Sequence, residues 1–237
     1  MKILAIEFSS TQRSAAVVDS RTGVPPVSDE GVVFSKTGET PVLLSEAVQT
    51  SGGHTLAFAL IEDALRQAKM EREEIDCLAV GLGPGSYTGI RMAISIAQGW
   101  QLAKAVRLLG VSSVDVLALH AQLEGVRGQV HLVIDAQRKE FYLATYEITE
   151  AEVRETEPLR LASLAEVQAR AQTGGCPAGP EVHEWFPEGR VLFPRASTLG
   201  RLAATKTNFV SGDKLEPIYL RPTRFVKAPP PRVLPTF

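Results

Sequence analysis

The spacing of hydrophobic residues changes several times along the first half of the chain. Short, nearly continuous apolar runs are typical of buried strands, whereas apolar residues that recur every three or four positions indicate an amphipathic helix. Three strand-like runs come first, and helical periods and strand-like runs then alternate. The predicted strands are residues 2–8, 14–19, 42–49, 75–80 and 106–111, and the predicted helices are residues 54–69, 88–104 and 112–123.

The predicted helix at 88–104 differs from the other two because it is apolar on nearly every side. Its large hydrophobic residues include Met92, Ile96 and Trp100, and several alanines lie between them. A helix with so little polar surface must be buried within its own domain or against a partner.

The pattern starts again after residues 123–129. Strand-like segments at 129–135 and 141–148 flank the polar sequence AQRKE and predict a hairpin, and two weaker helical segments follow at 164–172 and 196–205. Strands open each half and strand–helix units follow them. This order predicts an α/β protein with two related subdomains, each a mixed sheet flanked by helices.

We place the subdomains at residues 1–125 and 126–225. Residues 21–40 are rich in Gly, Pro, Ser and Thr and are expected to form a loop, with at most a short strand at 31–36. Residues 226–237 are rich in proline, which favours an extended tail over a central strand or helix.

Composition narrows the class of protein. The 237 residues include 25 Lys and Arg against 27 Asp and Glu, so the net charge of −2 excludes a strongly basic nucleic-acid binder but not a local basic patch. Cys77 and Cys176 do not make a disulfide framework, and no Cys-x-x-Cys motif occurs. The N-terminus is typical of a strand rather than a signal peptide, and no apolar run reaches the ~18 residues of a membrane span. We therefore expect a cytoplasmic protein with no membrane partner.

The glycine-rich run GLGPGSYTG at residues 81–89 lies between a predicted strand and a predicted helix. Backbone amides at such a turn, together with the helix N-terminus, favour binding of an anion. The residues alone support equally well a tight turn in which glycine permits positive φ and close packing. The candidate anion-binding loop consists of Gly83, Gly85, Ser86, Tyr87 and Thr88.

Three better-known motifs do not fit this run. A P-loop needs Lys where Tyr87 stands, a dinucleotide fingerprint needs Gly where Ser86 stands, and a nucleophile elbow needs Gly where Pro84 stands. Other candidate chemistry is sparse. Glu7, at the end of the first strand, could bind a metal or water, although such a carboxylate is more often simply hydrogen-bonded. Arg91 could pair with an anion, although an acidic neighbour is the commoner partner.

Residues 81–99, GLGPGSYTGIRMAISIAQG, closely resemble the signature of the TsaB (YeaZ) family of bacterial tRNA threonylcarbamoyladenosine (t6A) biosynthesis. The segments ILAIEFSS, GVSSVDVLA, IDAQRKEFY and EPIYLRP match in the family's order. The resemblance implies the actin-like, sugar-kinase and Hsp70-type fold. It also implies a non-catalytic scaffold subunit that binds and activates TsaD, the subunit that transfers the threonylcarbamoyl group, and that helps to recruit TsaE.

The same resemblance implies that this chain has no metal site. TsaD carries a His-x-x-x-His metal site, and the matching positions here are Ser113 and Leu117. Leu117 has no donor atom and Ser113 is a poor ligand, so we expect neither a metal nor catalysis by this chain alone. We expect no cofactor. Nucleotide binding is not favoured, because Glu7 replaces the family's usual Asp and no glycine follows it.

TsaB-like proteins associate through their first two helices, with themselves or with TsaD. The resemblance therefore implies a homodimer when the chain is alone, a heterodimer with TsaD, and contact with tRNA only through the complex. The alternative is that the same helix faces are covered within their own domain. The residues expected at the partner interface are Leu60, Ala64, Gly89, Met92, Ala93, Ile96, Ala97 and Trp100.

Two other classes of function stay open at this point. An ATP-dependent phosphotransferase of the same fold would need a second nucleotide-binding loop, and only the run at 81–89 is clear. A metallopeptidase would need metal ligands, and the spacing of the four histidines does not supply them.

Overall fold

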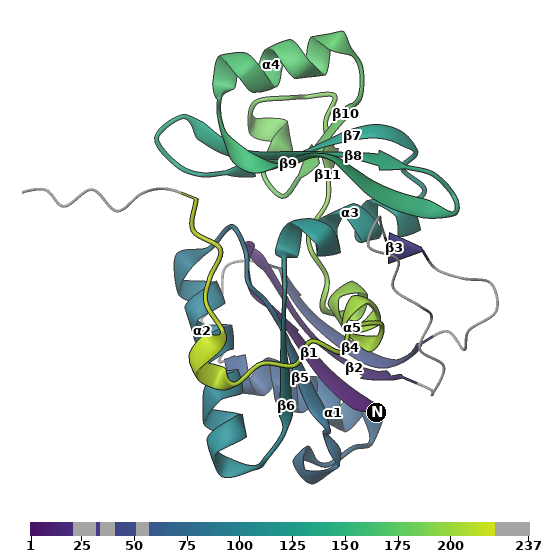
Figure 1. The fold of residues 1–237 in the computed structure, drawn as a ribbon, viewed down its shortest axis with the longest axis vertical. Coiled ribbons are helices and arrows are strands. Elements are labelled where there is room, and N and C mark those ends of the chain that lie inside the picture. Colours follow the sequence, from purple (N-terminus) through teal and green to yellow (C-terminus); the bar gives the residue numbers. More distant parts are fainter. Residues whose placement is uncertain (21–31, 34–40, 51–56, 221–237) are drawn as a thin grey trace, which may run out of the picture.

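The computed structural model describes residues 1–20, 32–33, 41–50 and 57–220. The first residues of the helix expected at 54–69, most of the loop expected at 21–40 and the tail expected at 226–237 lie outside the described residues. The described part forms two β-sheets with helices against them (Figure 1).

The first sheet is built on β1 (Lys2–Glu7), in which successive apolar residues are buried on opposite faces. β2 (Gln12–Asp19) pairs antiparallel with one side of β1, and β4 (Val42–Thr50) pairs antiparallel with β2. β5 (Cys77–Gly81) and β6 (Arg107–Val111) extend the other side in parallel. The strand order is therefore β4-β2-β1-β5-β6.

Helices cover both faces of this sheet. α1 (Ala57–Ala68) and α2 (Tyr87–Ala103) pack on one face, where they share a core with Leu4 and Ile6 of β1. α5 (Ala196–Ala204) packs on the opposite face, mainly against β1 and β2. Coverage on both faces explains why every residue of β5 is buried.

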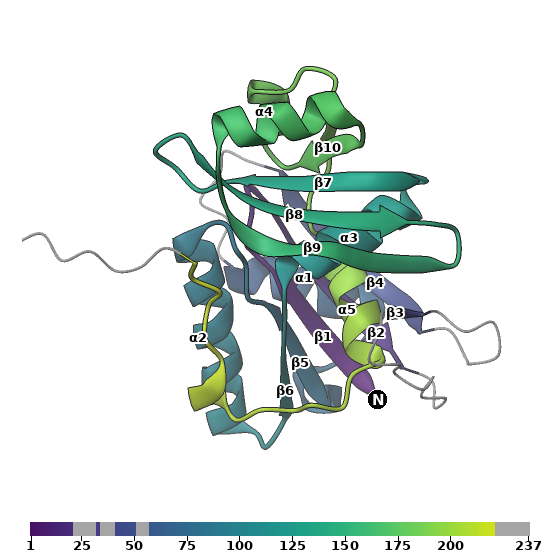
Figure 2. The same cartoon turned by 45° about the horizontal axis from the view of Figure 1, so that its top comes forward.

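The second sheet has the strand order β11-β10-β7-β8-β9-β3. α4 covers one face of it and α3 the other (Figure 2). The elements are β7 (Gly128–Asp135), β8 (Glu140–Ile148), β9 (Glu152–Ser163), β10 (Cys176–Gly179), β11 (Arg190–Val191), β3 (Val32–Val33), α4 (Leu164–Thr173) and α3 (Ser113–Leu123).

Apart from β3, which is added at one edge of the second sheet, the two sheets share one topology. In each, three antiparallel strands come first, a fourth strand joins the free side of the first in parallel, and a fifth joins the fourth. The next helix then crosses to the other sheet. α3 follows β6 but packs on β7, β8 and β9, and α5 follows β11 but packs on the first sheet. α3 is buried on most sides, and its residues join both sheets in one continuous core.

These elements confirm the expected pair of mixed sheets flanked by helices. The hydrophobic pattern does not predict β9, β10 or β11. β9 reads EVRETEPLRLAS, and its charges and proline suit a strand that pairs on one side along most of its length. The boundary at residue 125 falls between α3 and β7, yet β3, α3 and α5 each pack on the sheet formed by the other part of the chain.

Candidate functional site

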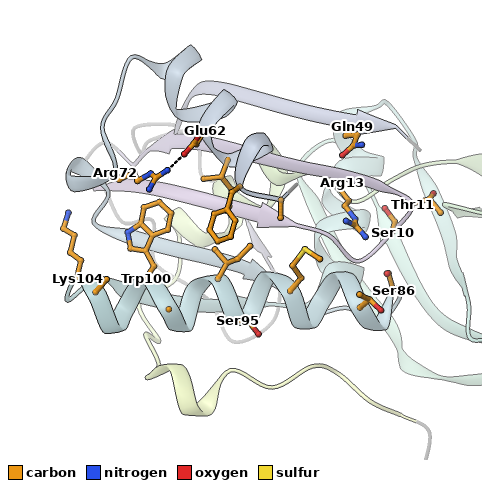
Figure 3. Close-up of a pocket in the computed structure, with 18 of the residues that line it drawn as sticks. Ser10, Thr11, Arg13, Gln49, Glu62, Arg72, Ser86, Ser95, Trp100 and Lys104 are labelled. Carbon is orange, nitrogen blue, oxygen red and sulfur yellow. Dashed lines mark hydrogen bonds and ion pairs between the residues drawn. The ribbon is translucent and has the colours of Figure 1, made fainter. Parts of the chain in front are cut away.

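A groove of about 1460 Å³ runs between α1 and α2 on the outer face of the first sheet (Figure 3). Phe58 of α1 and Met92, Ile96 and Trp100 of α2 supply much of its apolar lining. The four-residue spacing of the α2 positions places them on one face of the helix. Gly99 leaves room beside Trp100, since a Cβ added there would meet no atom within 4 Å.

Polar side chains flank the groove at both ends. Arg72 and Glu62 form an ion pair beside Trp100, and Lys104 donates to backbone carbonyl oxygens at the same end (Figure 3). The opposite end carries Ser10, Thr11, Arg13 and Ser86. An apolar floor with a polar rim is the usual composition of a protein-docking surface.

Gly89, Ala93 and Ala97 of α2 face the sheet rather than the groove, whereas Gly99 faces the groove. A Cβ on Gly89 would lie 2.0 Å from the backbone oxygen of Phe8, so glycine there allows the helix to pack closely on the residue that follows β1. The two alanines one and two turns later have no exposed surface. The residues of the expected interface that are buried in the chain's own core are Leu60, Ala64, Gly89, Ala93, Ile96 and Ala97. Of these only Ile96, which is 8% exposed, lines the groove, so the other five do not enter the proposal below.

Met92, Ile96 and Trp100 are the three residues of the expected interface that line the groove. Sequence reasoning missed Phe58, whose side chain is 59% exposed at the rim. The sequence feature that could have identified Phe58 is an aromatic residue on the otherwise polar side of α1. It also missed Arg72 and Lys104, because their approach to the groove depends on tertiary packing.

The glycine loop is a tight turn that sets the start of α2. Gly83 and Gly85 have φ values of +83° and +143°, which favour glycine. The Ser86 backbone amide donates to the Ser9 carbonyl oxygen at 2.7 Å, and the Ser86 hydroxyl accepts from the Gly89 amide as the N-cap. These contacts support the tight-turn interpretation, and anion binding by the loop stays a prediction.

The carboxyl group of Glu7 lies behind this loop and is fully buried. Its two oxygens accept 2.9 Å hydrogen bonds from the Ser9 backbone amide and the Ser113 hydroxyl. The Ser113 hydroxyl in turn accepts from the Gly83 amide at 3.1 Å. Burial raises the pKa of Glu7 because it disfavours the charged form, although the hydrogen bonds oppose this shift. Glu7 therefore joins three segments of the fold and does not face an open site.

Ser113 and Leu117 occupy the same buried region. Neither has exposed surface, and Leu117 packs in the core shared by the two sheets. In the described ranges 1–20, 32–33, 41–50 and 57–220, no group of three or more His, Cys, Asp or Glu side chains could hold a metal ion. None of the helices in those ranges is long and apolar enough to cross a bilayer.

A smaller cavity of about 420 Å³ lies between the glycine loop and the end of β7. Asp135 and Glu181 are among its lining residues. Burial raises the pKa of Glu181, and the nearby carboxylates of Asp135 and Glu184 raise it further. This concentration of negative charge disfavours a phosphate group in the cavity.

Comparisons with known proteins connect these features to a family. A family model described as TsaD, tRNA N6-adenosine threonylcarbamoyltransferase, matches residues 49–222. The chain is 29% identical to the Escherichia coli (strain K12) tRNA threonylcarbamoyladenosine biosynthesis protein TsaB over 179 residues, which cover 68% of this chain and 78% of that protein. It is 28% identical to the Chlorobium limicola tRNA N6-adenosine threonylcarbamoyltransferase over 116 residues, which cover 48% of this chain and 31% of that protein.

The fold is shared as well. The structure of YeaZ from Pseudomonas aeruginosa matches with a TM-score of 0.71 at 24% identity, covering 92% of this chain and 99% of that chain. The paired mixed sheets and this match confirm the expected actin-like, sugar-kinase and Hsp70-type fold. The family model spans well over half of the residues. The Escherichia coli relative is a TsaB protein, and the solved structure is of YeaZ, the other name of the same family. The chain therefore belongs to the TsaD family and is a TsaB/YeaZ-like member of it.

Proposed function

We propose that this chain is a non-catalytic subunit of a t6A-synthesising complex and that it binds the TsaD of its own organism through the groove between α1 and α2. The name of the Escherichia coli relative supports the role in t6A biosynthesis. The observation that supports this docking surface is that the apolar lining of the groove is only partly covered by the rest of the chain. Trp100 and Met92 are only half-buried, and Phe58 is largely exposed. Exposed aromatic residues beside an apolar pocket are typical energetic anchors of interfaces.

The proposal that the chain lacks catalysis of its own is supported by positions 113 and 117. Ser113 is hydrogen-bonded to Glu7 and Gly83, and Leu117 lies in the core. Neither side chain is available as a ligand. The chain then acts on TsaD by binding, because contacts that are stronger with one TsaD conformation shift the population toward that conformation.

The same groove serves self-association in this proposal. Two copies without TsaD cover their grooves against each other as a symmetric homodimer, and TsaD displaces one copy. TsaE and tRNA join the complex after TsaD has bound. The complex assembles in the cytoplasm.

The test is size-exclusion chromatography of the full chain with TsaD of the same organism. Gly99→Arg is the informative variant, because position 99 faces open space and an arginine there fills the groove without disturbing the core. Leu102→Arg is the matched control, because it adds the same charge to the same helix at a residue that is 89% exposed. We expect the wild type and Leu102→Arg to co-elute with TsaD, and Gly99→Arg to elute separately.

Different results would overturn different parts of the proposal. Separate elution of the wild type and TsaD, with and without ATP, would overturn the subunit role. Co-elution of Gly99→Arg to the wild-type extent would place TsaD on another surface. Trp100→Ala should weaken binding of TsaD about thirtyfold, which corresponds to the ~2 kcal/mol of an interface hot spot.

A further inference from the structure

Three exposed side chains form a cluster near the start of α2, outside the groove. The rings of Tyr87 and Tyr219 are stacked with their centroids 5.9 Å apart, and they are 57% and 48% exposed. The guanidinium group of Arg91 lies 4.5 Å from the centroid of the Tyr87 ring, and its Nε donates a 3.0 Å hydrogen bond to the Tyr219 hydroxyl. We call these three residues the Tyr–Arg cluster. Together they present aromatic and guanidinium planes to solvent.

The charge of Arg91 is not neutralised within the described part of the chain. None of the ion pairs formed by the described residues includes it. Its Nε is bonded to Tyr219, so the two terminal nitrogens of the guanidinium remain as donors. The guanidinium group of Arg91 lies over the Tyr87 ring, and its hydrogen bond to the Tyr219 hydroxyl fixes its position. A planar cation held in this way is well suited to bind a phosphate group with its other donors.

The sequence next to the cluster is basic. Residues 221–237, which begin two positions after Tyr219, contain four basic residues and no acidic residue, although the whole chain has a net charge of −2. Unpaired RNA is bound by exposed aromatic and guanidinium groups, because its bases stack on their planes while its phosphates pair with the guanidinium cation. Paired RNA keeps its bases inside the helix and gains little from such planes.

We propose that the Tyr–Arg cluster stacks an unpaired base of an RNA loop and that Arg91 binds an adjacent phosphate. This inference rests on the proposed function, in which tRNA is the substrate of the complex, and it gives this chain a direct contact with RNA. Asp135 and Glu181 lie across the small cavity that Tyr87 also lines. Their negative charge keeps the phosphates of the RNA on the α2 side of that cavity.

Fluorescence anisotropy of the full chain with two labelled RNAs tests this inference. One RNA is a hairpin with an unpaired loop, and the other is a blunt duplex of the same length. We expect the double variant Tyr87→Ala with Tyr219→Ala to bind the hairpin about tenfold or more weakly than the wild type does, and to bind the duplex almost unchanged. Arg91→Gln should lower the salt dependence of hairpin binding by about one phosphate contact.

Two control variants separate stacking from other effects. Tyr87→Phe keeps the aromatic plane and should bind the hairpin as the wild type does. Leu102→Ala removes an exposed apolar side chain of the same helix that lines neither the groove nor the cluster, and it should leave RNA binding unchanged. Thermal unfolding of all variants should match the wild type, because the truncated side chains are exposed.

The inference is overturned if the wild type and the double alanine variant bind the hairpin equally. It is also overturned if the wild type shows no binding at about 100 μM, the weak end of non-specific RNA affinity. Loss of co-elution with TsaD in the double variant, with RNA binding intact, would assign the cluster to a protein contact instead. The RNA measurement contains no TsaD, so failure of this inference and failure of the proposed subunit role are separate results.

Discussion

The hydroxyl of Ser113 at the start of α3 donates a 2.9 Å hydrogen bond to the buried carboxyl of Glu7 at the end of β1. The two residues are 106 positions apart in the sequence. Gly83 joins the same network through its amide, so one carboxyl group holds together the first strand, the glycine loop and α3. The resemblance to the TsaB family matches Ser113 to a metal-ligand position of TsaD. In this chain the Ser113 hydroxyl is buried and hydrogen-bonded to Glu7 and to the Gly83 amide.

Glu7→Gln should flatten the pH dependence of stability. Burial raises the pKa of Glu7 in the folded protein above its ordinary value of 4.5, so the unfolded chain releases this proton at a lower pH than the folded protein does. The contribution of Glu7 to the free energy of unfolding is therefore largest below 4.5 and is lost as the pH rises through the folded-state pKa. Urea unfolding at a series of pH values measures it.

At the acidic end of this series, the wild type and Glu7→Gln should differ by about 1 kcal/mol or less. Glutamine has the same shape, its oxygen can accept from the Ser9 amide, and its NH2 group can donate to the Ser113 hydroxyl as the protonated carboxyl group can. Parallel curves across the whole range would show that Glu7 does not titrate with a different pKa in the folded protein.

Gly81→Ala should destabilise the protein by about 2 kcal/mol or more, as an overpacked core position does. A Cβ there would lie 2.1 Å from Glu7 Oε2, and the buried carboxyl has little room to move. Gly99→Ala is the matched control, because its Cβ meets no atom within 4 Å and alanine favours a helix by about 0.8–1.0 kcal/mol over glycine. Opposite signs of the two changes in chemical denaturation are expected. A stabilising Gly81→Ala would contradict the packing of Glu7.

Ala93→Glu should prevent stable folding, whereas Leu102→Glu on the same helix should change stability by about 0.5 kcal/mol or less. Ala93 has no exposed surface and would bury a charge without a partner, but Leu102 is 89% exposed. Soluble yield and thermal unfolding distinguish the two variants. A well-folded Ala93→Glu protein would return the small residues of α2 to the set of candidate interface residues.

Glu46→Ala should cost about 2 kcal/mol, because it leaves a partly buried arginine and a helix start without their shared partner. Glu46 accepts hydrogen bonds of 3.2 and 2.7 Å from the Arg195 side chain and one of 3.0 Å from the Ser197 amide at the start of α5. Asp63→Ala provides the comparison, because its partner Arg66 is 80% exposed and such pairs contribute about 0.5 kcal/mol or less. Equal losses in denaturant unfolding would show that Glu46 does not anchor α5.

Elements with a long apolar segment and a clear start are predictable from sequence. α2 and α3 begin where serine can cap them, and Ser86 and Ser112 are their N-caps. β9 escapes prediction because its charges and proline resemble a loop, while its strand state depends on pairing with β8. The residues of β9 alone do not indicate that it pairs with β8.

The orientation of α2 is the part of the site that sequence reasoning does not resolve. Gly89 and Ala93 form one apolar stripe on this helix, and Met92 and Trp100 form a neighbouring one. Either stripe could face the sheet on periodicity alone, and small residues suit close packing against a sheet as well as against a partner. The close approach of Gly89 to Phe8 shows that the stripe of small residues faces the sheet. This contact forms only in the folded chain, so the sequence does not reveal it. The pairing of Glu7 with Ser113 is hidden for the same reason.

Because α3 and α5 each pack on the sheet formed by the other part of the chain, the two parts are expected to fold together as one unit. Each sheet depends, for one of its buried faces, on a helix that the other part of the sequence encodes. A cut after residue 125 would leave each fragment with a bare apolar sheet face and a helix without its sheet, so the fragments would fold only by complementing each other. The same interlock opposes swinging of two lobes about a hinge. The groove between α1 and α2 is thus held in a fixed direction relative to the second sheet.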